Sequence, residues 1–252
     1  MKETIYTIPL SEAFDSGDEC PFCQLERAVE QRTIRYVLGP GASYMEPDVR
    51  AATDAEGFCG AHFKKMYDYG NSLGSALMMQ TYMVGLFEQM SAEMKAFQLP
   101  GKRGLFSKKS SAEESSLVKW ARQRQSTCFI CGKIDYNMAR YYDTFFMLTK
   151  DAEFRQKVEN SKGFCMRHFL ALMEVAPDQV PNSQQEWFYA TTFSLMRENM
   201  ARVKDDLDWF IEKFDYRNAS ADWRNSRDAV SRSMQKLQGV YPADPPYKSE
   251  PR

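Results

Sequence analysis

Apolar residues recur along much of the chain at alternating steps of three and four positions, the spacing of a helix that packs on one side. The longest such stripe contains Tyr189, Phe193, Met196, Met200, Val203, Leu207, Phe210 and Phe214. A second stripe contains Ala76, Met79, Met83, Phe87, Met90, Met94 and Phe97. We expect these two stripes to form the core where two helical units of the chain meet. The alternative is that one of them is a groove for another protein or for a second copy of the chain.

Shorter helices are predicted from periodicity and from residues typical of helix ends. A third stripe contains Ile134, Met138, Tyr141, Phe145 and Leu148. Its counterpart at residues 24–38 is less regular and stops before Gly39. Pro47 suits the first turn of a short helix, and Asp151 suits an N-cap. Further helices are expected at residues 117–125 and 226–237, the latter ending at Gly239. The predicted fold class is therefore all-α.

Every cysteine and histidine of the chain lies in one repeated pattern. Cys-x-x-Cys occurs twice and Cys-x-x-His occurs twice, and the eight residues are Cys20, Cys23, Cys59, His62, Cys128, Cys131, Cys165 and His168. Two ligands three positions apart can face one ion from a single turn, and two such turns complete a tetrahedron. Three thiols and one imidazole form a donor set typical of closed structural zinc. We therefore predict two zinc ions per chain, with these eight residues as the metal ligands.

The metal motifs reveal an internal duplication. Cys59 and His62 recur 106 positions later as Cys165 and His168, within the matching segments Gly57–Phe63 and Gly163–Phe169. The register continues without a gap for about forty residues, which indicates two copies of one helical unit. The expected assembly is two duplicated copies, each with its own Cys3His site, packed together. A crossed arrangement that joins Cys20 and Cys23 to Cys165 and His168 uses the same donors and stays open.

Each metal site is expected where the starts of helices converge. Apolar residues at helical spacing follow both Cys-x-x-Cys pairs and both Cys-x-x-His pairs. A thiolate is stabilised near the positive end of a helix. Three thiolates, a neutral histidine and Zn²⁺ sum to a charge of −1, which the helix starts would help to stabilise.

The cysteines allow three other interpretations. Cys20-Pro-Phe-Cys23 alone resembles a glutaredoxin-type redox motif, but no strand pattern surrounds it. Three disulfides are possible by count, yet they leave the placement of both histidines unexplained. A Cys3His iron–sulfur cluster remains open at this stage.

Composition and charge add further limits. The formal net charge is −1, which gives no general argument for nucleic acid or an anionic membrane as partner. No apolar run approaches the roughly 20 residues of a membrane span, and residues 1–14 lack the features of a signal peptide. We expect a cytoplasmic protein, in which cysteines serve as ligands or redox groups more often than as disulfides.

The predicted organisation has five segments. Residues 1–99 form the first copy and residues 117–214 the second. Residues 100–116 are rich in Ser and Lys and are expected to be a flexible linker. A chain reversal and a helix occupy residues 215–239, and a tail rich in proline and charge, expected to be disordered, follows at residues 240–252.

Longer segments accompany the metal motifs. Tyr6–Phe14 precedes the first Cys-x-x-Cys pair, and Met45–Arg50 precedes the first Gly-Phe-Cys motif. Glu153-Phe-Arg155 precedes the second Gly-Phe-Cys motif, and Lys213–Asn218 and Trp223 follow it. Together these segments resemble a bacterial family of unknown function whose members carry the same duplicated Cys-x-x-Cys and Gly-Phe-Cys-x-x-His motifs. The resemblance extends to about Gly239, includes all eight candidate ligands, and implies no activity.

The sequence favours a protein that is not an enzyme. Catalytic zinc usually keeps one coordination position open, whereas each set here supplies four ligands. No nucleophile with a base stands out, no histidine is left over, and no catalytic or cofactor-binding residue is assigned. The expected function is a helical scaffold, stabilised by zinc, that binds another protein. A zinc–thiolate redox switch and an enzyme that uses a cleft between the copies are the alternatives, and the oligomeric state is not predicted.

Overall fold

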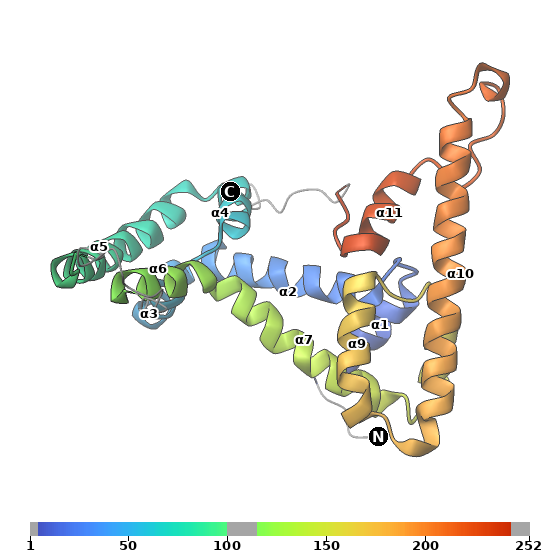
Figure 1. Cartoon of the computed structure of the whole chain (residues 1–252), viewed down its shortest axis with the longest axis horizontal. Helices are drawn as coiled ribbons and strands as arrows, with labels where there is room; N and C mark the ends of the chain where they lie inside the picture. Colours follow the sequence, from blue (N-terminus) through green and yellow to red (C-terminus); the bar gives the residue numbers. More distant parts are fainter. Residues whose placement is uncertain (1–4, 100–114, 243–252) are drawn as a thin grey trace, which may run out of the picture. The chain divides into compact units, whose positions relative to one another are not determined.

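Helices dominate the computed structural model, which describes residues 5–99 and 115–242 (Figure 1). Within these ranges the chain forms eleven α-helices and no strand, so the predicted all-α class is confirmed. None of these helices is both long enough and apolar enough to cross a lipid bilayer. Most of the predicted linker and most of the predicted C-terminal tail lie outside the described residues.

The described residues contain helices of very different lengths, from three to 28 residues. In chain order they are α1 (Thr7–Asp15), α2 (Pro21–Leu38), η1 (Ser43–Met45), α3 (Pro47–Glu56), α4 (Gly60–Tyr69), α5 (Ser72–Ala96), α6 (Ser116–Ser126), α7 (Phe129–Leu148), α8 (Ala152–Glu159), α9 (Met166–Gln179), η2 (Asn182–Gln184), α10 (Gln185–Glu212), η3 (Tyr216–Asn218) and α11 (Ala229–Gln238).

Local sequence signals explain several helix ends. Pro47 occupies the first turn of α3, where its missing N–H costs nothing. The carboxylate of Asp151 accepts a hydrogen bond from the backbone N–H of Glu153 and caps α8. Gly239 follows α11 with a φ of 76°, a left-handed conformation that glycine adopts without steric cost. These three predicted signals are confirmed.

The described chain divides into two compact units. Among the described residues, unit 1 contains those up to Val29 and those from Asp135 to residue 242, and unit 2 contains Glu30 to Ile134. Both boundaries fall inside long helices, α2 and α7. Each unit therefore combines segments from both sequence copies.

Unit 1 has an aromatic core. Phe14, Phe22, Phe145 and Phe164 are at most 5% exposed and lie within van der Waals contact of one another. Phe22 belongs to the first Cys-x-x-Cys motif and Phe164 precedes Cys165. The core of this unit therefore extends directly to two of the ligand segments.

Unit 2 is built around α3, which packs against α5 and η1. Its buried apolar side chains include Ile34, Leu38, Met66, Met78 and Ile130. Ile130 lies inside the second Cys-x-x-Cys motif, so this core also reaches a ligand segment.

The two long apolar stripes have different surroundings. On α10, Met196 and Val203 are buried, and this helix packs against α11. On α5, the stripe residues Met83 and Phe87 are 66% and 65% exposed. The expectation of a buried core is therefore wrong for α5, because the helices that pack against it leave this side open. It holds only in part for the stripe of α10, where Phe193 and Phe214 are 51% and 74% exposed.

Candidate metal centres

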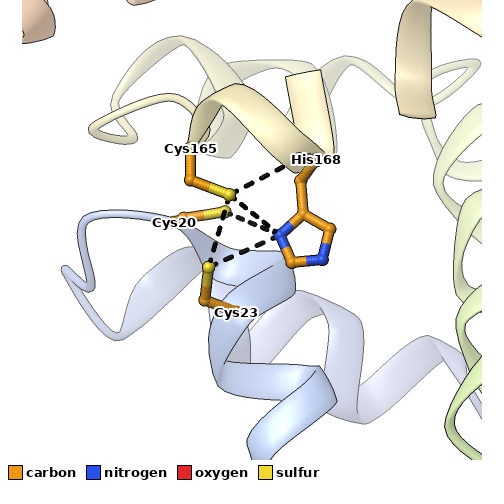
Figure 2. A group of neighbouring side chains, drawn as sticks. All are labelled: Cys20, Cys23, Cys165 and His168. Atoms are coloured by element: carbon orange, nitrogen blue, oxygen red, sulfur yellow. Dashed lines mark hydrogen bonds between the residues drawn. The ribbon is translucent and has the colours of Figure 1, made fainter. Parts of the chain in front are cut away.

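The six cysteines and two histidines gather in two groups of four. Site 1 consists of Cys20, Cys23, Cys165 and His168 (Figure 2), and site 2 consists of Cys59, His62, Cys128 and Cys131. Within each group the candidate ligand atoms all lie within 4.8 Å of one another. Both are Cys3His groups that could hold a metal ion, as the donor pattern predicted.

The pairing of the ligand segments differs from the main expectation. Each site joins a Cys-x-x-Cys pair of one sequence copy to the Cys-x-x-His pair of the other copy. The expected pairing within a copy is wrong, and the crossed alternative is what the structure has. The physical reason lies in α2, which at 18 residues carries the chain about 27 Å away from Cys20 and Cys23. Cys59 and His62 then follow in unit 2, whereas Cys165 and His168 belong to unit 1 together with Cys20 and Cys23.

All four ligand pairs lie at the start of a helix, as expected. Cys59 and Cys165 are the N-cap residues of α4 and α9. Cys20 and Cys128 directly precede α2 and α7, and their carbonyl oxygens accept hydrogen bonds from the first turns. The second ligand of each pair follows in that first turn. Because the N-terminal end of a helix is partially positive, two helix starts stabilise the thiolates of each site.

A Gly-Phe dipeptide directly precedes each Cys-x-x-His motif and helps to position it. Gly57 and Gly163 have φ angles of 67° and 72°, which residues with a Cβ rarely adopt. Of the phenylalanines that follow, Phe164 is fully buried and packs against Phe22 at 5.8 Å between ring centroids, and Phe58 packs against Phe129 at 6.5 Å. In site 2 the backbone N–H of Phe129 donates to the carbonyl of Gly57. This bond joins its two ligand segments directly.

The donor spacing fits one tetrahedral ion. With ordinary metal–sulfur and metal–nitrogen bonds, a tetrahedral site holds sulfur atoms about 3.8 Å apart and sulfur and nitrogen about 3.6 Å apart. The Sγ atoms of Cys23 and Cys165 are 3.6 Å apart, and those of Cys59 and Cys131 are 4.0 Å apart. Nδ1 of His168 lies 3.3–3.4 Å from the three sulfurs of site 1. These distances match the edges of a small tetrahedron within a few tenths of an ångström.

Each histidine faces the sulfurs with Nδ1 and a carboxylate with Nε2. Nε2 of His62 lies 3.0 Å from Oε1 of Glu30, and Nε2 of His168 lies 3.5 Å from Oε2 of Glu26. Such a carboxylate holds the proton on Nε2 and leaves the lone pair of Nδ1 free for a metal. Arg167 in turn pairs with Glu26, and Lys65 with Glu30.

A comparison with protein families identifies the family of the chain. A family model described as "Family of unknown function (DUF6062)" matches residues 1–244. The chain belongs to the DUF6062 family. The resemblance drawn from the repeated motifs is thereby confirmed. No curated protein and no solved structure matches the sequence.

The electrostatics of both sites in this DUF6062 protein favour a cation among the sulfurs. Burial opposes a charge on His62, but hydrogen bonds with Cys128 and Glu30 outweigh it and raise its pKa to about 10. In His168 burial is likewise outweighed, by Cys165 and other partners, and the pKa rises to about 12. Before a metal binds, a proton on each imidazole therefore compensates the charge of one neighbouring thiolate, since the pKa of Cys128 and of Cys165 is lowered while that of Cys131 and of Cys23 is raised. A metal ion would replace that proton with a larger charge.

The two sites differ in exposure. In site 1, Cys20 and Cys165 are fully buried and His168 is 2% exposed. In site 2, Cys59 and Cys131 are only half-buried. The C-terminal end of α11 explains part of the difference, because a Cβ added at Gly239 would meet Sγ of Cys165 at 3.2 Å. The glycine backbone thus lies directly over the sulfur.

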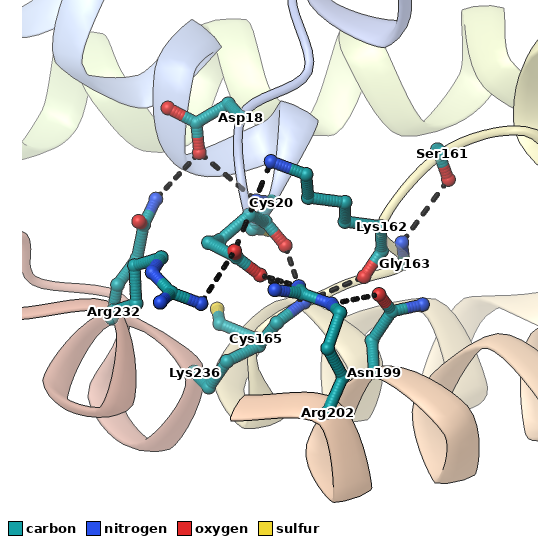
Figure 3. A network of polar contacts seen from close by, with 12 residues as sticks. Asp18, Cys20, Ser161, Lys162, Gly163, Cys165, Asn199, Arg202, Arg232 and Lys236 are labelled. Atoms are coloured by element: carbon teal, nitrogen blue, oxygen red, sulfur yellow. Dashed lines mark hydrogen bonds and ion pairs between the residues drawn. The ribbon is translucent and has the colours of Figure 1, made fainter. Parts of the chain in front are cut away.

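A buried lysine links the two ligand segments of site 1 (Figure 3). Nζ of Lys236, on α11, donates to the carbonyl oxygens of Glu19 and Lys162, both at 2.6 Å. Glu19 directly precedes Cys20, and Lys162 lies three positions before Cys165. One ammonium group, in a side chain that is 2% exposed, therefore holds together the backbone of both segments.

The carboxylate of Glu19 contacts both this lysine and a neighbouring arginine. Oε2 of Glu19 lies 2.5 Å from a guanidinium nitrogen of Arg202 and 3.3 Å from Nζ of Lys236. Arg232, also on α11, pairs with Asp206 at 2.8 Å. Because α11 contributes Arg232 and Lys236 to this buried network, its polar side faces inward.

Sequence reasoning missed these supporting residues. Glu26 and Glu30 lie three and seven positions after Cys23, on the same face of a helix, so their spacing carried a signal. Arg167 lies inside the Cys-x-x-His motif itself. Nothing in the sequence indicated that the two glutamates serve different sites, or that Lys236 points inward.

Proposed function

We propose that this DUF6062 protein binds two zinc ions that hold its helical segments together, and that it acts as a non-enzymatic scaffold for another macromolecule. The observation that carries the proposal is the pair of Cys3His groups with the spacing of a single tetrahedral ion. Each group joins segments far apart in the chain. An ion at either site would therefore stabilise the fold as a cross-link does.

Zinc suits these groups better than an iron–sulfur cluster does. Three thiolates and one imidazole in a tetrahedron are typical of structural zinc. An iron–sulfur cluster would place several atoms between the cysteine sulfurs and hold them farther apart than the 3.6 Å between Cys23 and Cys165. All six cysteines are free, which argues against the disulfide alternative.

A structural role follows from the number of ligands. Four protein donors leave no coordination position for water or substrate, which catalytic zinc requires. Structural zinc in small peptides contributes about 10–16 kcal/mol of apparent binding free energy. A whole domain is stable by about 5–15 kcal/mol. Loss of zinc would therefore unfold the ligand segments.

Metal analysis and thermal unfolding test this proposal together. The full chain, purified without chelator, is expected to contain two zinc ions, and chelation is expected to lower its melting temperature sharply. A Cys165→Ser variant is the internal control, because it is expected to retain one zinc. Well under one zinc per wild-type chain would refute the assignment, and so would a melting temperature that chelation leaves unchanged.

The exposure of site 2 favours a second candidate function, a thiol redox switch. Cys59 and Cys131 are half-buried, and their Sγ atoms are 4.0 Å apart. A peroxide could take one electron from each thiolate, so that the two sulfurs form a disulfide and the peroxide becomes two water molecules with the uptake of two protons. The remaining two ligands would bind zinc too weakly to hold it.

Peroxide titration of the zinc-loaded protein tests the switch. One zinc per chain is expected to leave at modest peroxide, with a disulfide between Cys59 and Cys131 detectable by mass spectrometry. Cys165, fully buried in site 1, is expected to remain reduced. Retention of both ions, or earlier oxidation of site 1, would rule the switch out while leaving the scaffold proposal intact.

A further inference from the structure

The outer side of α5 carries an apolar surface that the described residues do not cover. We call it the α5 face. Seven of its large side chains are 40–66% exposed: Leu73, Met79, Met83, Val84, Phe87, Met94 and Phe97. At 1.5 Å per residue the face extends over about 36 Å. Contiguous apolar surface of this size on a helix marks an interaction site more often than a solvated face.

The α5 face has no charge. From Ser72 to Phe87 the helix contains no charged residue, and the three that follow are Glu88, Glu93 and Lys95. On a helical projection none of the three falls within the apolar stripe. A surface helix normally carries charges on its solvent side, so the composition of α5 is that of a helix with a partner on that side.

The equivalent helix of the second copy is covered over part of its apolar stripe. Met90 and Phe97 of α5 correspond to Met196 and Val203 of α10, at an offset of 106 residues. Met196 and Val203 are 8% and 3% exposed, and α11 packs against α10. Phe97 is 40% exposed. The chain thus supplies an additional helix for part of this surface in the second copy, where Phe193, the counterpart of Phe87, remains 51% exposed.

We propose that the α5 face binds the same face of a second copy of this chain, so that two α5 helices pair about a twofold axis. A twofold interface places one surface against itself, and the absence of charge means that no like charges meet across the axis. From Met79 to Phe97 the stripe advances in steps of three and four residues. This is the spacing with which two helices interlock.

The exposed area of the face is sufficient for a stable dimer. The exposed fractions of the seven side chains correspond to an area on the order of 700–800 Å² per chain, against the roughly 800 Å² per partner of a standard interface. This inference rests on the proposed scaffold function, because it identifies the bound macromolecule as a second copy of the chain. The α5 face contains no metal ligand, so the two proposals can fail independently.

The experiment measures the mass of the zinc-loaded full chain by light scattering and analytical ultracentrifugation. The wild type is expected at twice the chain mass of 29.2 kDa. Met83→Glu and Phe87→Glu place a charge in the middle of the face and are expected to weaken the dimer at least about 30-fold, as loss of an interface hot spot does. Both side chains are more than 60% exposed, so circular dichroism and zinc content are expected to stay unchanged.

Met234→Glu is the matched control. Met234 lies on α11, is 48% exposed, and is also an apolar residue on an outward helix side. This variant is expected to remain a dimer. A monomeric wild type that contains two zinc ions would overturn the inference, as would a dimer that survives both α5 substitutions or one that Met234→Glu dissociates. A dimer without zinc would support the α5 face and refute only the zinc assignment.

Discussion

Nε2 of His62 lies 3.0 Å from Oε1 of Glu30, while Nδ1 of the same ring faces three sulfurs at 3.2–3.4 Å. The carboxylate therefore selects the tautomer that presents a lone pair to the sulfur-lined site. Glu26 stands in the same relation to His168 of site 1. Both glutamates belong to α2 and lie four positions apart, yet they serve different metal sites.

Glu30→Gln is expected to weaken zinc binding at site 2 by roughly 10- to 100-fold, the usual effect of losing a carboxylate that orients a ligating histidine. The amide can still occupy the space, but it no longer supplies the charge that stabilises the zinc-bound imidazole. Competition with a chromogenic chelator measures the change. A Cys165→Ser background, in which site 2 alone is complete, assigns the affinity to that site.

Glu26→Gln provides the reciprocal control for this substitution. In the same background it is expected to leave the affinity of site 2 unchanged, because the metal ligand that Glu26 contacts is His168 of site 1. In a Cys131→Ser background, which disables site 2, the effects of the two substitutions are expected to exchange. Equal effects of both substitutions at one site would contradict the assigned roles.

Lys236→Met is expected to destabilise the protein by about 3–5 kcal/mol, as removal of one partner from a buried ionic network does. The change leaves the carbonyl oxygens of Glu19 and Lys162 and the carboxylate of Glu19 without their shared ammonium donor. Urea unfolding of the zinc-loaded protein measures the loss. Zinc is also expected to leave site 1 before site 2, the reverse of the order expected for the wild type from exposure.

Lys204→Met is the control for that loss. Lys204 lies on α10, and its side chain is 69% exposed, so the substitution is expected to change stability by less than about 0.5 kcal/mol. If both variants were equally stable, the ammonium of Lys236 would have no structural role at site 1.

Gly57→Ala is expected to cost about 1–3 kcal/mol, because the backbone there has φ 67° and ψ −160°, a region that only glycine populates readily. An added Cβ would also lie 2.7 Å from Oη of Tyr82. Thermal unfolding of the zinc-loaded protein measures the effect. Gly60→Ala is the control, since a Cβ at that helical position meets nothing within 4 Å, and its stability is expected to be unchanged or slightly raised.

Helices and metal ligands could be predicted from the sequence because each leaves a local signal. The spacing of Ile134, Met138 and Tyr141 predicts most of α7, and Asp151 and Gly239 mark the helix ends that the structure shows. The ligands were found because only Cys and His donate sulfur and imidazole nitrogen, and because their pattern occurs twice.

The pairing of the ligands and the orientation of α11 could not be predicted in this way. Both pairings give each ion three sulfurs and one nitrogen, so donor chemistry cannot choose between them. The choice depends on where α2 carries the chain, which is a property of the fold. In α11, Val230, Met234 and Leu237 suggest an inward apolar side, yet all three are at least 38% exposed. Its polar side faces inward because it meets the carboxylate of Glu19, more than two hundred residues earlier.

The crossed pairing predicts how many zinc ions remain in double cysteine variants. Cys23→Ser and Cys165→Ser each remove one ligand of site 1, so each variant is expected to retain the single zinc of site 2. Their combination is also expected to retain one zinc, because the second substitution affects a site that is already disabled. Cys23→Ser combined with Cys59→Ser disables both sites and is expected to retain none. Elemental analysis after dialysis against a weak chelator provides the count.

Pairing within each sequence copy would give the opposite result. Cys23 and Cys59 would then share one ion and their double variant would keep one zinc, whereas the double variant of Cys23 and Cys165 would keep none.

The same logic applies to residues 1–99 expressed alone, which contain two half-sites and no complete crossed site. Such a fragment can complete a Cys3His group of the observed type only when two fragments meet, so its zinc content is expected to depend on its concentration. Binding of one zinc by a monomeric fragment would contradict the crossed arrangement.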